Sequence, residues 1–258
     1  MLRQYKGAKQ GYKQKQVLLN QFPVLILNYM RPKNLTEFIL PALLKESAIS
    51  KIIIAHGRKD TVFGVDELED GEIKQVGAIW HIGNYAKNDE YRCFRRWDLV
   101  YSLREKGILT EECIFIQDDD IMFHFNEINK LYKNYEQHKG VLISGSFGRN
   151  IQNNNYDAQI VSGKCDIVIG QSIFGSITTI CNAVKEIRAK NIPTELLCYE
   201  DDITMCYFTL KDKKIKNKQH FSSPLKYTGL SENDAVCSRP DHLEMRNRTL
   251  TYLLNLSV

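Results

Sequence analysis

The sequence lacks long apolar runs, and its first residues lack the features of a secretion signal. Apolar runs such as residues 24–27 end after a few positions, far short of the about 20 residues that a membrane-spanning helix requires. Residues 1–6 contain neither the apolar stretch nor the small-residue cleavage site of a signal peptide. We therefore expect no transmembrane segment and no secretory leader.

The cysteines form neither a C-x-x-C pair nor a cluster with histidine at zinc-site spacing. Their number is odd, and several lie in apolar surroundings, where a free cysteine acts as a small hydrophobe. The seven are Cys93, Cys113, Cys165, Cys181, Cys198, Cys206 and Cys237. This pattern predicts reduced thiols and a reducing compartment, the cytoplasm.

Neither charge is in strong excess, because 35 Lys and Arg against 31 Asp and Glu give a net charge of +4. The lysine-rich residues 211–218 are not interleaved with aromatic side chains, which proteins that bind single-stranded nucleic acid use for stacking. Lysine clusters of this kind usually solvate a surface. We therefore expect no nucleic-acid partner.

Short apolar runs alternate with helical periodicity along the first half of the chain. The predicted buried strands are residues 22–27, 51–55, 78–81 and 113–116. The predicted helices between them are residues 34–43, interrupted at Pro41, and residues 89–106. This order is typical of an α/β protein with a mixed, mainly parallel Rossmann-like sheet flanked by helices.

The second half reads as a continuation of the same unit, with no composition break that would mark a linker. Its predicted strands, residues 141–146 and 166–169, are separated by the polar residues 150–155. Its predicted helices are residues 176–190, 201–210 and 241–254. We expect residues 1–20 to form a basic arm and residues 21–258 to form one compact domain.

The strongest chemical signal is the triplet Asp118, Asp119 and Asp120, which follows a buried strand directly. Three adjacent carboxylates repel one another and need a cationic partner, and Mg²⁺ or Mn²⁺ takes such oxygen ligands. The alternative is a solvated acidic turn or a helix cap. Because ligands bind beyond the carboxyl ends of parallel strands, residues 28–31 and 56–58 should converge on this triplet.

Two further charged clusters come later in the chain. Glu200, Asp201 and Asp202 open a predicted helix, where they either cap it or face a reacting group. Arg239 lies in residues 238–242 and would neutralise a departing diphosphate, or else belongs to a surface ion-pair network. Trp97 and Trp80 are most simply core aromatics.

Five motifs in this order resemble those of nucleotide-sugar glycosyltransferases of the GT-A fold, and most of all the exostosin-like group, glycosyltransferase family 64. The resemblance runs from about residue 22 to residue 254. It rests on residues 27–31 (LNYMR), 116–120 (IQDDD), 167–174 (IVIGQSIF), 200–205 (EDDITM) and 227–242, which contain YTGLS and RPDH.

The resemblance implies a role for each matching residue. The nucleotide-sugar would be bound by Asn28, Tyr29, Arg31, His56, Asn88, Arg92, Asp118, Asp119 and Gly170, with Arg95 as the alternative to Arg92. Asp120 would ligate the metal directly, together with Asp118. Asp202 would approach the anomeric carbon, and Asp201 and Arg239 complete the implied catalytic group. Residues 21–120 would form the nucleotide-binding half, and residues 121–258 the acceptor-binding half.

The implied activity is transfer of a sugar from a UDP-sugar, an N-acetylhexosamine or a pentose such as xylose, to a hydroxyl group of a glycan or glycoprotein. Two alternatives stay open: a metal-dependent nucleotidyltransferase or phosphotransferase, and a non-catalytic sugar-binding protein. Cellular members of the family are usually anchored in the Golgi lumen. The absence of an anchor and the odd cysteine count instead suggest a microbial or virus-encoded cytoplasmic enzyme.

Overall fold

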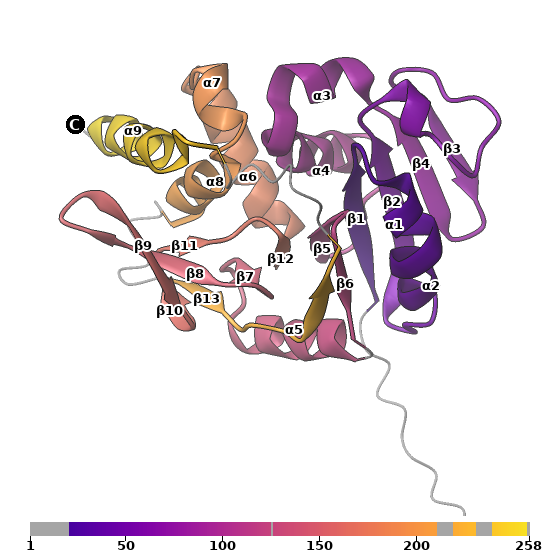
Figure 1. Ribbon diagram of the computed structural model, residues 1–258, viewed down its shortest axis with the longest axis horizontal. Helices are drawn as coiled ribbons and strands as arrows, with labels where there is room; N and C mark the ends of the chain where they lie inside the picture. Colours follow the sequence, from indigo (N-terminus) through magenta and orange to yellow (C-terminus); the bar gives the residue numbers. More distant parts are fainter. Residues whose placement is uncertain (1–20, 125, 211–218, 231–238, 257–258) are drawn as a thin grey trace, which may run out of the picture.

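A nine-stranded sheet runs through the computed structural model, which describes residues 21–124, 126–210, 219–230 and 239–256. Four neighbouring strands at its centre are parallel, in the order β5-β1-β2-β4 (Figure 1). They are β1 (Phe22–Asn28), β2 (Ile49–His56), β4 (Ile79–Gly83) and β5 (Cys113–Asp118). Each contains one of the apolar runs of the sequence, so the predicted mainly parallel α/β sheet is confirmed.

Antiparallel pairing begins on both sides of this parallel core. Beside β5 the order is β12-β7-β13-β10, in which β7 and β13 are parallel and the other pairs antiparallel, and β3 (Ile73–Val76) pairs antiparallel with β4 at the other edge. The first four are β12 (Ser172–Ser176), β7 (Ile143–Ser144), β13 (His220–Ser222) and β10 (Gly163–Cys165). The mixed character of the sheet therefore comes mainly from residues after 140.

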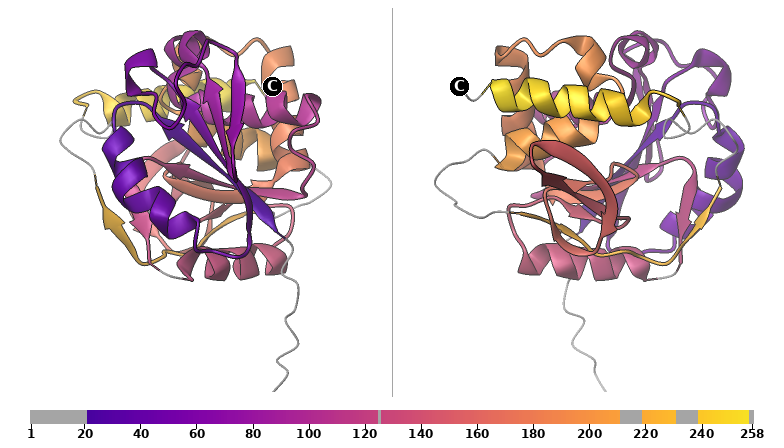
Figure 2. Two further views of the ribbon diagram at one scale, coloured as in Figure 1. Left: turned by 90° about the vertical axis from the view of Figure 1, so that its right-hand side faces the viewer. Right: turned by 60° about the vertical axis from the view of Figure 1, so that its left-hand side comes forward.

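Two smaller sheets flank the large one. One has the order β11-β8-β9 and contains β8 (Gly148–Gln152), β9 (Asn155–Val161) and β11 (Ile167–Val168). The other pairs β6 (Ile121–Phe123) with β14 (Tyr227–Gly229), which places residue 230 next to the acidic triplet. The right panel of Figure 2 shows the β8–β9 hairpin in front of the large sheet and α9 above it.

Helices cover both faces of the large sheet, and strand alternation divides the core between them. In β1, Leu25 packs toward one face, while Val24 and Ile26 pack toward the other, as the two-residue period of a strand requires. The first face is covered by α4 (Arg95–Glu105) and α6 (Ile177–Ala189), and the second by α2 (Leu40–Leu43) and α5 (Glu127–Gln137). The remaining helices are α1 (Pro32–Asn34), α3 (Tyr85–Tyr91), α7 (Thr194–Leu197), α8 (Asp201–Leu210) and α9 (His242–Asn255).

The structure differs from the predicted elements in two places. The helix expected over residues 89–106 is two helices, α3 and α4, separated at Arg92 by a backbone φ of 46° and a 3₁₀ turn. The polar residues 150–155 form the β8–β9 hairpin rather than a loop, with Asn153 and Asn154 both at positive φ. Asparagine tolerates this conformation, and two such residues in succession match the right-handed twist of a hairpin.

Other expectations hold or lie outside the described residues. A π-helical turn at Leu35–Ile39 precedes Pro41, whose ring nitrogen has no hydrogen to continue the helical ladder. Within the described ranges, no helix is both long and apolar enough to span a membrane. The predicted arm at residues 1–20, the basic residues 211–218 and Cys237 lie outside those ranges.

We predict that Phe174→Ala lowers the free energy of unfolding by about 3–5 kcal/mol, because Phe174 is fully buried among aromatic rings. Its ring centroid lies 4.8 Å from that of Phe22 and 5.0 Å from that of Tyr135. Urea denaturation measures the change. Phe38→Ala is the control, since Phe38 is 43% exposed, and equal losses in the two variants would contradict this account of the core.

Candidate functional site

The order of the parallel strands creates a point where two loops diverge. From β1 the chain proceeds to β2 and β4 on one side, and then returns to β5 on the other side of β1. Leu27 and Asp118 are register partners where β1 and β5 end, so the loops that follow separate above this pair. Such switch points at the carboxyl ends of strands are where open α/β sheets bind ligands.

The three aspartates after β5 have different surroundings. Asp119 is 4% exposed and holds the loop after β1, accepting from the backbone N–H of Tyr29 at 3.1 Å and from Arg31 at 2.9 Å. Asp120 Oδ2 lies 3.8 Å from the Arg31 guanidinium, whereas its Oδ1 is buried with no partner among the described residues. Asp119 thus supports the loop, and Asp120 retains an oxygen that can accept a ligand.

Hydrogen bonds from neighbouring segments hold the turn that carries these aspartates. The Gln117 carboxamide donates to the carbonyl of Ile121 at 2.8 Å, across the turn. Asn34 donates to the carbonyl of Asp119 at 3.1 Å, and the N–H of Leu230 donates to the carbonyl of Asp120 at 2.6 Å. The backbone of the turn is therefore fixed from three directions.

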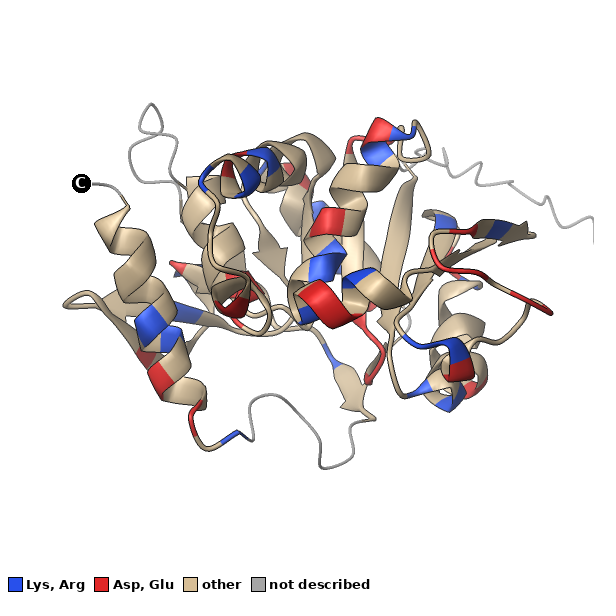
Figure 3. Cartoon of the chain, turned by 90° about the horizontal axis from the view of Figure 1, so that it is seen from above, with Lys and Arg blue, Asp and Glu red and all other residues tan. Residues whose placement is uncertain are grey.

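Arg96 of α4 joins the acidic turn to the second acidic cluster. Its NH1 donates to Asp118 Oδ1 at 2.7 Å and to the carbonyl of Gly170 at 2.5 Å, and its Nε lies 3.4 Å from Asp201 Oδ2. The indole N–H of Trp97 donates to the same oxygen of Asp201 at 2.7 Å. Seen from above, acidic and basic positions lie side by side at the centre of the molecule (Figure 3). One guanidinium thus connects three segments that are far apart in the sequence.

A second buried arginine holds the other carboxylates at the start of α8. Arg246 of α9 contacts both oxygens of Asp202, at 3.1 and 2.9 Å, and Glu200 Oε2 at 3.0 Å. The guanidinium also lies 4.3 Å from the ring centroid of Tyr156. A Cβ added at Gly170 would lie 3.9 Å from Asp202 and 3.6 Å from Arg96, so the two arginine-centred clusters meet at this glycine.

Burial changes the proton affinity of these carboxyl groups. It raises the pKa of Asp118 to about 7, against the opposing charge of Arg96, and the pKa of Glu200 to about 8, against that of Arg246. Burial also raises the pKa of Asp201. Groups of perturbed pKa gathered beside a strand-end crevice are typical of functional sites.

Asn28 and His56 lie in the protein interior at the ends of β1 and β2, because both are fully buried. The Asn28 amide nitrogen is 2.9 Å from His56 Nδ1 and donates to the carbonyl of Thr61 at 2.9 Å. His56 Nε2 lies 3.1 Å from Nδ1 of His81. Burial lowers the pKa of His56 to about 4, so the ring is neutral near pH 7. This pair supports the loop ends, and Asn28 Oδ1 is buried with no partner among the described residues.

Tyr29 is flanked by arginines at the mouth of the crevice. Its hydroxyl lies 3.4 Å from the Arg92 guanidinium, and the Arg58 guanidinium lies 5.9 Å from its ring centroid. Arg92 has a positive φ of 46°, a strained conformation that functional sites often retain. Together with Arg31, these side chains make this edge of the crevice cationic.

The alternative residue, Arg95, has a different environment. It is 1% exposed and donates to the Asn88 carboxamide at 3.2 Å, and the Asn84 amide, with its oxygen turned inward, accepts from it at 2.7 Å. Burial lowers the pKa of Arg95 to about 9. Arg92 therefore reaches the crevice, whereas Arg95 and Asn88 form a buried pair behind it.

Arg239, the predicted diphosphate contact, lies beside the second cluster. It pairs with Asp241 at 2.9 Å, and its guanidinium is 4.5 Å from the ring centroid of Tyr199. Within the described ranges no hydrogen bond or ion pair connects it to residues 118–120, so the structure does not bring these two predictions together.

The sequence reading missed Arg96 and the pairing of Arg246. Arg96 lies four residues before Val100 and so shares the buried face of α4. A charged residue at such a position indicates a buried ion pair, and this pattern could have identified Arg96 from the sequence. Trp97 is fully buried and its N–H donates to Asp201, which confirms the prediction that it is a core aromatic.

No family model matches the chain, and a search of curated proteins finds no significant match. The fold itself is a mixed α/β, Rossmann-like arrangement in which a large sheet is flanked by helices. The resemblance to glycosyltransferases therefore stays a prediction from the motifs.

We predict that Arg96→Met lowers the free energy of unfolding by about 3–5 kcal/mol, because it leaves the buried carboxylate of Asp201 and the half-buried carboxylate of Asp118 without their shared cation. Chemical denaturation at pH 7 measures the loss. Arg248→Met is the control, an exposed arginine on α9 whose removal should change stability by about 0.5 kcal/mol or less. A loss no larger than in this control would show that Arg96 is not the connection described here.

The raised pKa of Glu200 should make the stability of the protein depend on pH. Its pKa rises to about 8 on folding from an ordinary value of 4.5, so between these values the folded chain keeps a proton that the unfolded chain releases. Stability contributed by this group therefore falls as pH rises through that window. We predict that Glu200→Gln flattens the decline between pH 5 and 8 by about 1–3 kcal/mol, measured by urea denaturation at each pH. The exposed Glu195→Gln should keep the wild-type slope; an unchanged slope in Glu200→Gln would refute the assignment.

Proposed function

We propose that the chain is a metal-dependent glycosyltransferase of the GT-A type, which transfers a sugar from a UDP-sugar to a hydroxyl group of a glycan or glycoprotein. The observation that carries the proposal is the connection made by Arg96. It joins Asp118, Gly170 and Asp201, one residue from each of three motifs that were singled out separately in the sequence. Such convergence at a switch point is expected of one active site and has no simple explanation as three unrelated surface features.

Asp120 is the residue best suited to hold the metal. Its buried Oδ1 has no partner in the described part of the chain, and a carboxylate oxygen is the ligand that Mn²⁺ and Mg²⁺ prefer. Asp118 is the second candidate, although Arg96 occupies its Oδ1. Among the described residues no three His, Cys, Asp or Glu side chains form a metal site, so the diphosphate would complete the ligand set. A bound divalent ion would act as a Lewis acid on the departing nucleoside diphosphate.

The cationic edge of the crevice would position the donor. Arg92 at the Tyr29 hydroxyl and Arg31 on Asp119 provide guanidinium groups suited to paired hydrogen bonds with phosphate oxygens. Because Asp119 fixes Arg31 and the N–H of Tyr29 together, this edge is organised before a ligand binds. A preorganised charge does not need to reorient as negative charge develops on the diphosphate.

Asp202 would face the sugar. It lies next to Gly170, which also contacts Arg96, and Arg246 holds its carboxylate in one orientation. In an inverting reaction Asp202 would accept the proton of the acceptor hydroxyl. In a retaining reaction, which the family resemblance implies, it would stabilise the positive charge of the sugar or form a transient bond to it. Asp201, held by Trp97 and Arg96, would act as a positioning residue.

A nucleotidyltransferase or phosphotransferase that uses two metal ions is less well supported. That chemistry needs two or more carboxylates directed at one pair of ions. Here Asp119 is committed to Tyr29 and Arg31, and Arg96 takes an oxygen of Asp118. A non-catalytic sugar-binding protein would have no use for buried acidic groups of raised pKa beside the crevice.

We propose the cytoplasm as the place of action. The cysteines of the described ranges, Cys93, Cys113, Cys165, Cys181, Cys198 and Cys206, are all free thiols. Free thiols of this kind agree with a reducing compartment, where disulfides do not persist.

We predict that Asp120→Asn weakens Mn²⁺-dependent binding of UDP at least about tenfold, because it removes the charge of the metal ligand while keeping the side-chain shape. Isothermal titration of UDP with and without Mn²⁺ measures the effect. Asp157→Asn, on the outward β8–β9 hairpin, should bind UDP as the wild type does. UDP binding that is independent of Mn²⁺, or unchanged in Asp120→Asn, would contradict the metal role.

The same wild-type protein distinguishes the proposed activity from its rival. A glycosyltransferase releases UDP from a UDP-sugar, slowly when the sugar is transferred to water and faster when it is transferred to an acceptor. A nucleotidyltransferase instead consumes a nucleoside triphosphate and releases pyrophosphate. Product analysis with a panel of UDP-sugars, including UDP-N-acetylhexosamines and UDP-xylose, therefore tests both and identifies the sugar. Pyrophosphate release from triphosphates, without cleavage of any UDP-sugar, would overturn the proposal.

A further inference from the structure

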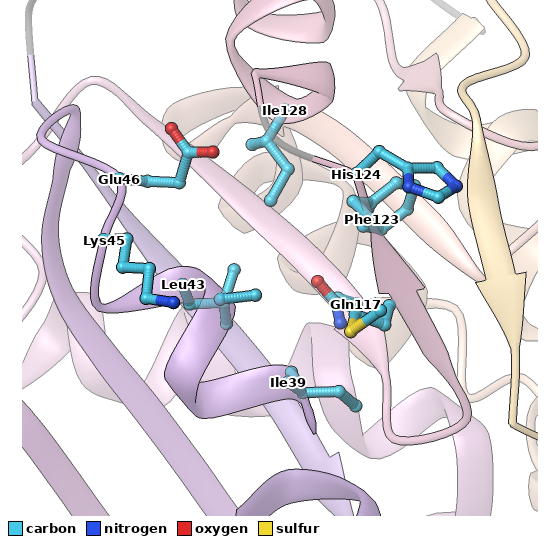
Figure 4. A pocket seen from close by; sticks show the side chains of 10 residues that line it. Ile39, Leu43, Lys45, Glu46, Gln117, Phe123, His124 and Ile128 are labelled. Carbon is cyan, nitrogen blue, oxygen red and sulfur yellow. The ribbon is translucent and has the colours of Figure 1, made fainter. Parts of the chain in front are cut away.

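A cavity of about 250 Å³ lies on the opposite face of the large sheet from Arg96. It lies between α2, β6 and the first turn of α5 and is partly open to solvent (Figure 4). Its walls are mostly apolar and come from Ile39, Ala42, Leu43, Met122, Phe123 and Ile128. For comparison, an apolar cavity of about 150 Å³ in another protein is large enough to bind benzene.

One polar atom is directed into this apolar space. Gln117 is 1% exposed, and its Nε2 donates to the carbonyl of Ile121 at 2.8 Å, which identifies the other end of the carboxamide as the oxygen. That oxygen is buried and has no partner among the described residues. Figure 4 shows it pointing toward the space between α2 and β6. A buried acceptor without a donor is rare in folded proteins and requires an explanation.

The other polar side chains of the lining do not supply that donor. Glu46 is an acceptor whose oxygens already receive the N–H of Asn126 at 3.1 Å and the Asn129 amide at 3.0 Å. Lys45 and His124 are exposed. The interior of the cavity thus offers apolar walls and one acceptor, Gln117. A lone water molecule fits poorly, because a buried water normally makes about three hydrogen bonds.

We propose that this cavity is a second ligand site, for a small uncharged molecule that combines one apolar ring or short chain with one O–H or N–H donor. The apolar part fills the space between Leu43, Phe123 and Ile128, and the donor binds Gln117 Oε1. An uncharged ligand suits these walls, because the charged lining residues are Lys45, which is exposed, and Glu46, whose oxygens already accept from Asn126 and Asn129. The proposal does not depend on the glycosyltransferase activity.

The position of Gln117 connects this site to the acidic turn. Gln117 precedes Asp118 in β5, and the same carboxamide closes the turn through the carbonyl of Ile121. A ligand that binds the carboxamide oxygen also orients the nitrogen that holds the turn. Occupancy of the cavity therefore fixes one of the contacts beneath Asp118 and Asp120.

Phenol and toluene test the proposal, because they share one ring and differ in the presence of a donor. Their dissociation constants are measured by ligand-observed NMR titration on the full chain, with the wild type, Gln117→Met and Ala42→Leu. We expect saturable binding of phenol by the wild type. The preference for phenol over toluene should fall about tenfold in Gln117→Met, because the acceptor is lost.

Ala42→Leu, which fills part of the cavity from α2, should weaken binding of both probes at least about tenfold, because the larger side chain occupies the space that the ring needs. Ala189→Leu is the matched control on the exposed end of α6 and should leave both affinities unchanged. The proposal fails if wild-type protein binds neither probe saturably, or if Ala42→Leu binds both as the wild type does. It also fails if the phenol preference survives in Gln117→Met; should that variant not fold, a phenol-soaked crystal must show the hydroxyl on Gln117.

Discussion

The pairing of Arg96 with the carboxylates of Asp118 and Asp201 is the interaction on which the candidate site depends. The carboxylate of Asp118 at the end of β5 is half-buried and that of Asp201 at the start of α8 is buried, and two like charges in such a place repel each other. The charge of Arg96 compensates both carboxylates, and the same guanidinium donates to the carbonyl of Gly170. Because each partner belongs to a different segment, the contact fixes α4, β5, the loop before β12 and α8 relative to one another.

Some acidic side chains of the site are paired with protein groups, and one keeps an oxygen without a partner among the described residues. Asp119 accepts hydrogen bonds from Tyr29 and Arg31. Asp201 accepts one from Trp97 and forms an ion pair with Arg96. Asp120 keeps a buried oxygen without a partner. Three adjacent aspartates that are equivalent in the sequence thus have three environments. The backbone of the turn directs their side chains to different neighbours, and Gln117, Asn34 and Leu230 hold that backbone in place.

Much of the fold followed from the sequence because continuous apolar runs identify strands that are buried on both faces. The runs at β1, β2 and β5 were each found to within three residues of the observed ends, and so were the helices α6, α8 and α9. The β8–β9 hairpin was missed, because its strands are polar and its turn depends on two asparagines at positive φ. The break at Arg92 was missed because neither glycine nor proline marks it in the sequence.

Local sequence predicted where charged groups would gather, but not which of them would pair. Asp118, Asp120 and Asp202 were chosen from their position at the ends of a strand and a helix, and in the structure Arg96 and Gly170 connect Asp118 with Asp202. Arg96 could not be assigned in this way, because its three partners come from residues 118, 170 and 201 and meet only when the sheet is assembled. His56 was expected on an open wall, and its burial against Asn28 and His81 likewise depends on tertiary packing.

The most direct measurement of the central claim is a crystal structure of the chain with Mn²⁺ and UDP, with manganese located by its anomalous signal. The account predicts manganese on the carboxylate of Asp120, the diphosphate of UDP beside Arg31, and Arg96 still bound to Asp118 and Asp201. Manganese and UDP at another place, or an Asp120 carboxylate that contacts neither, would contradict it.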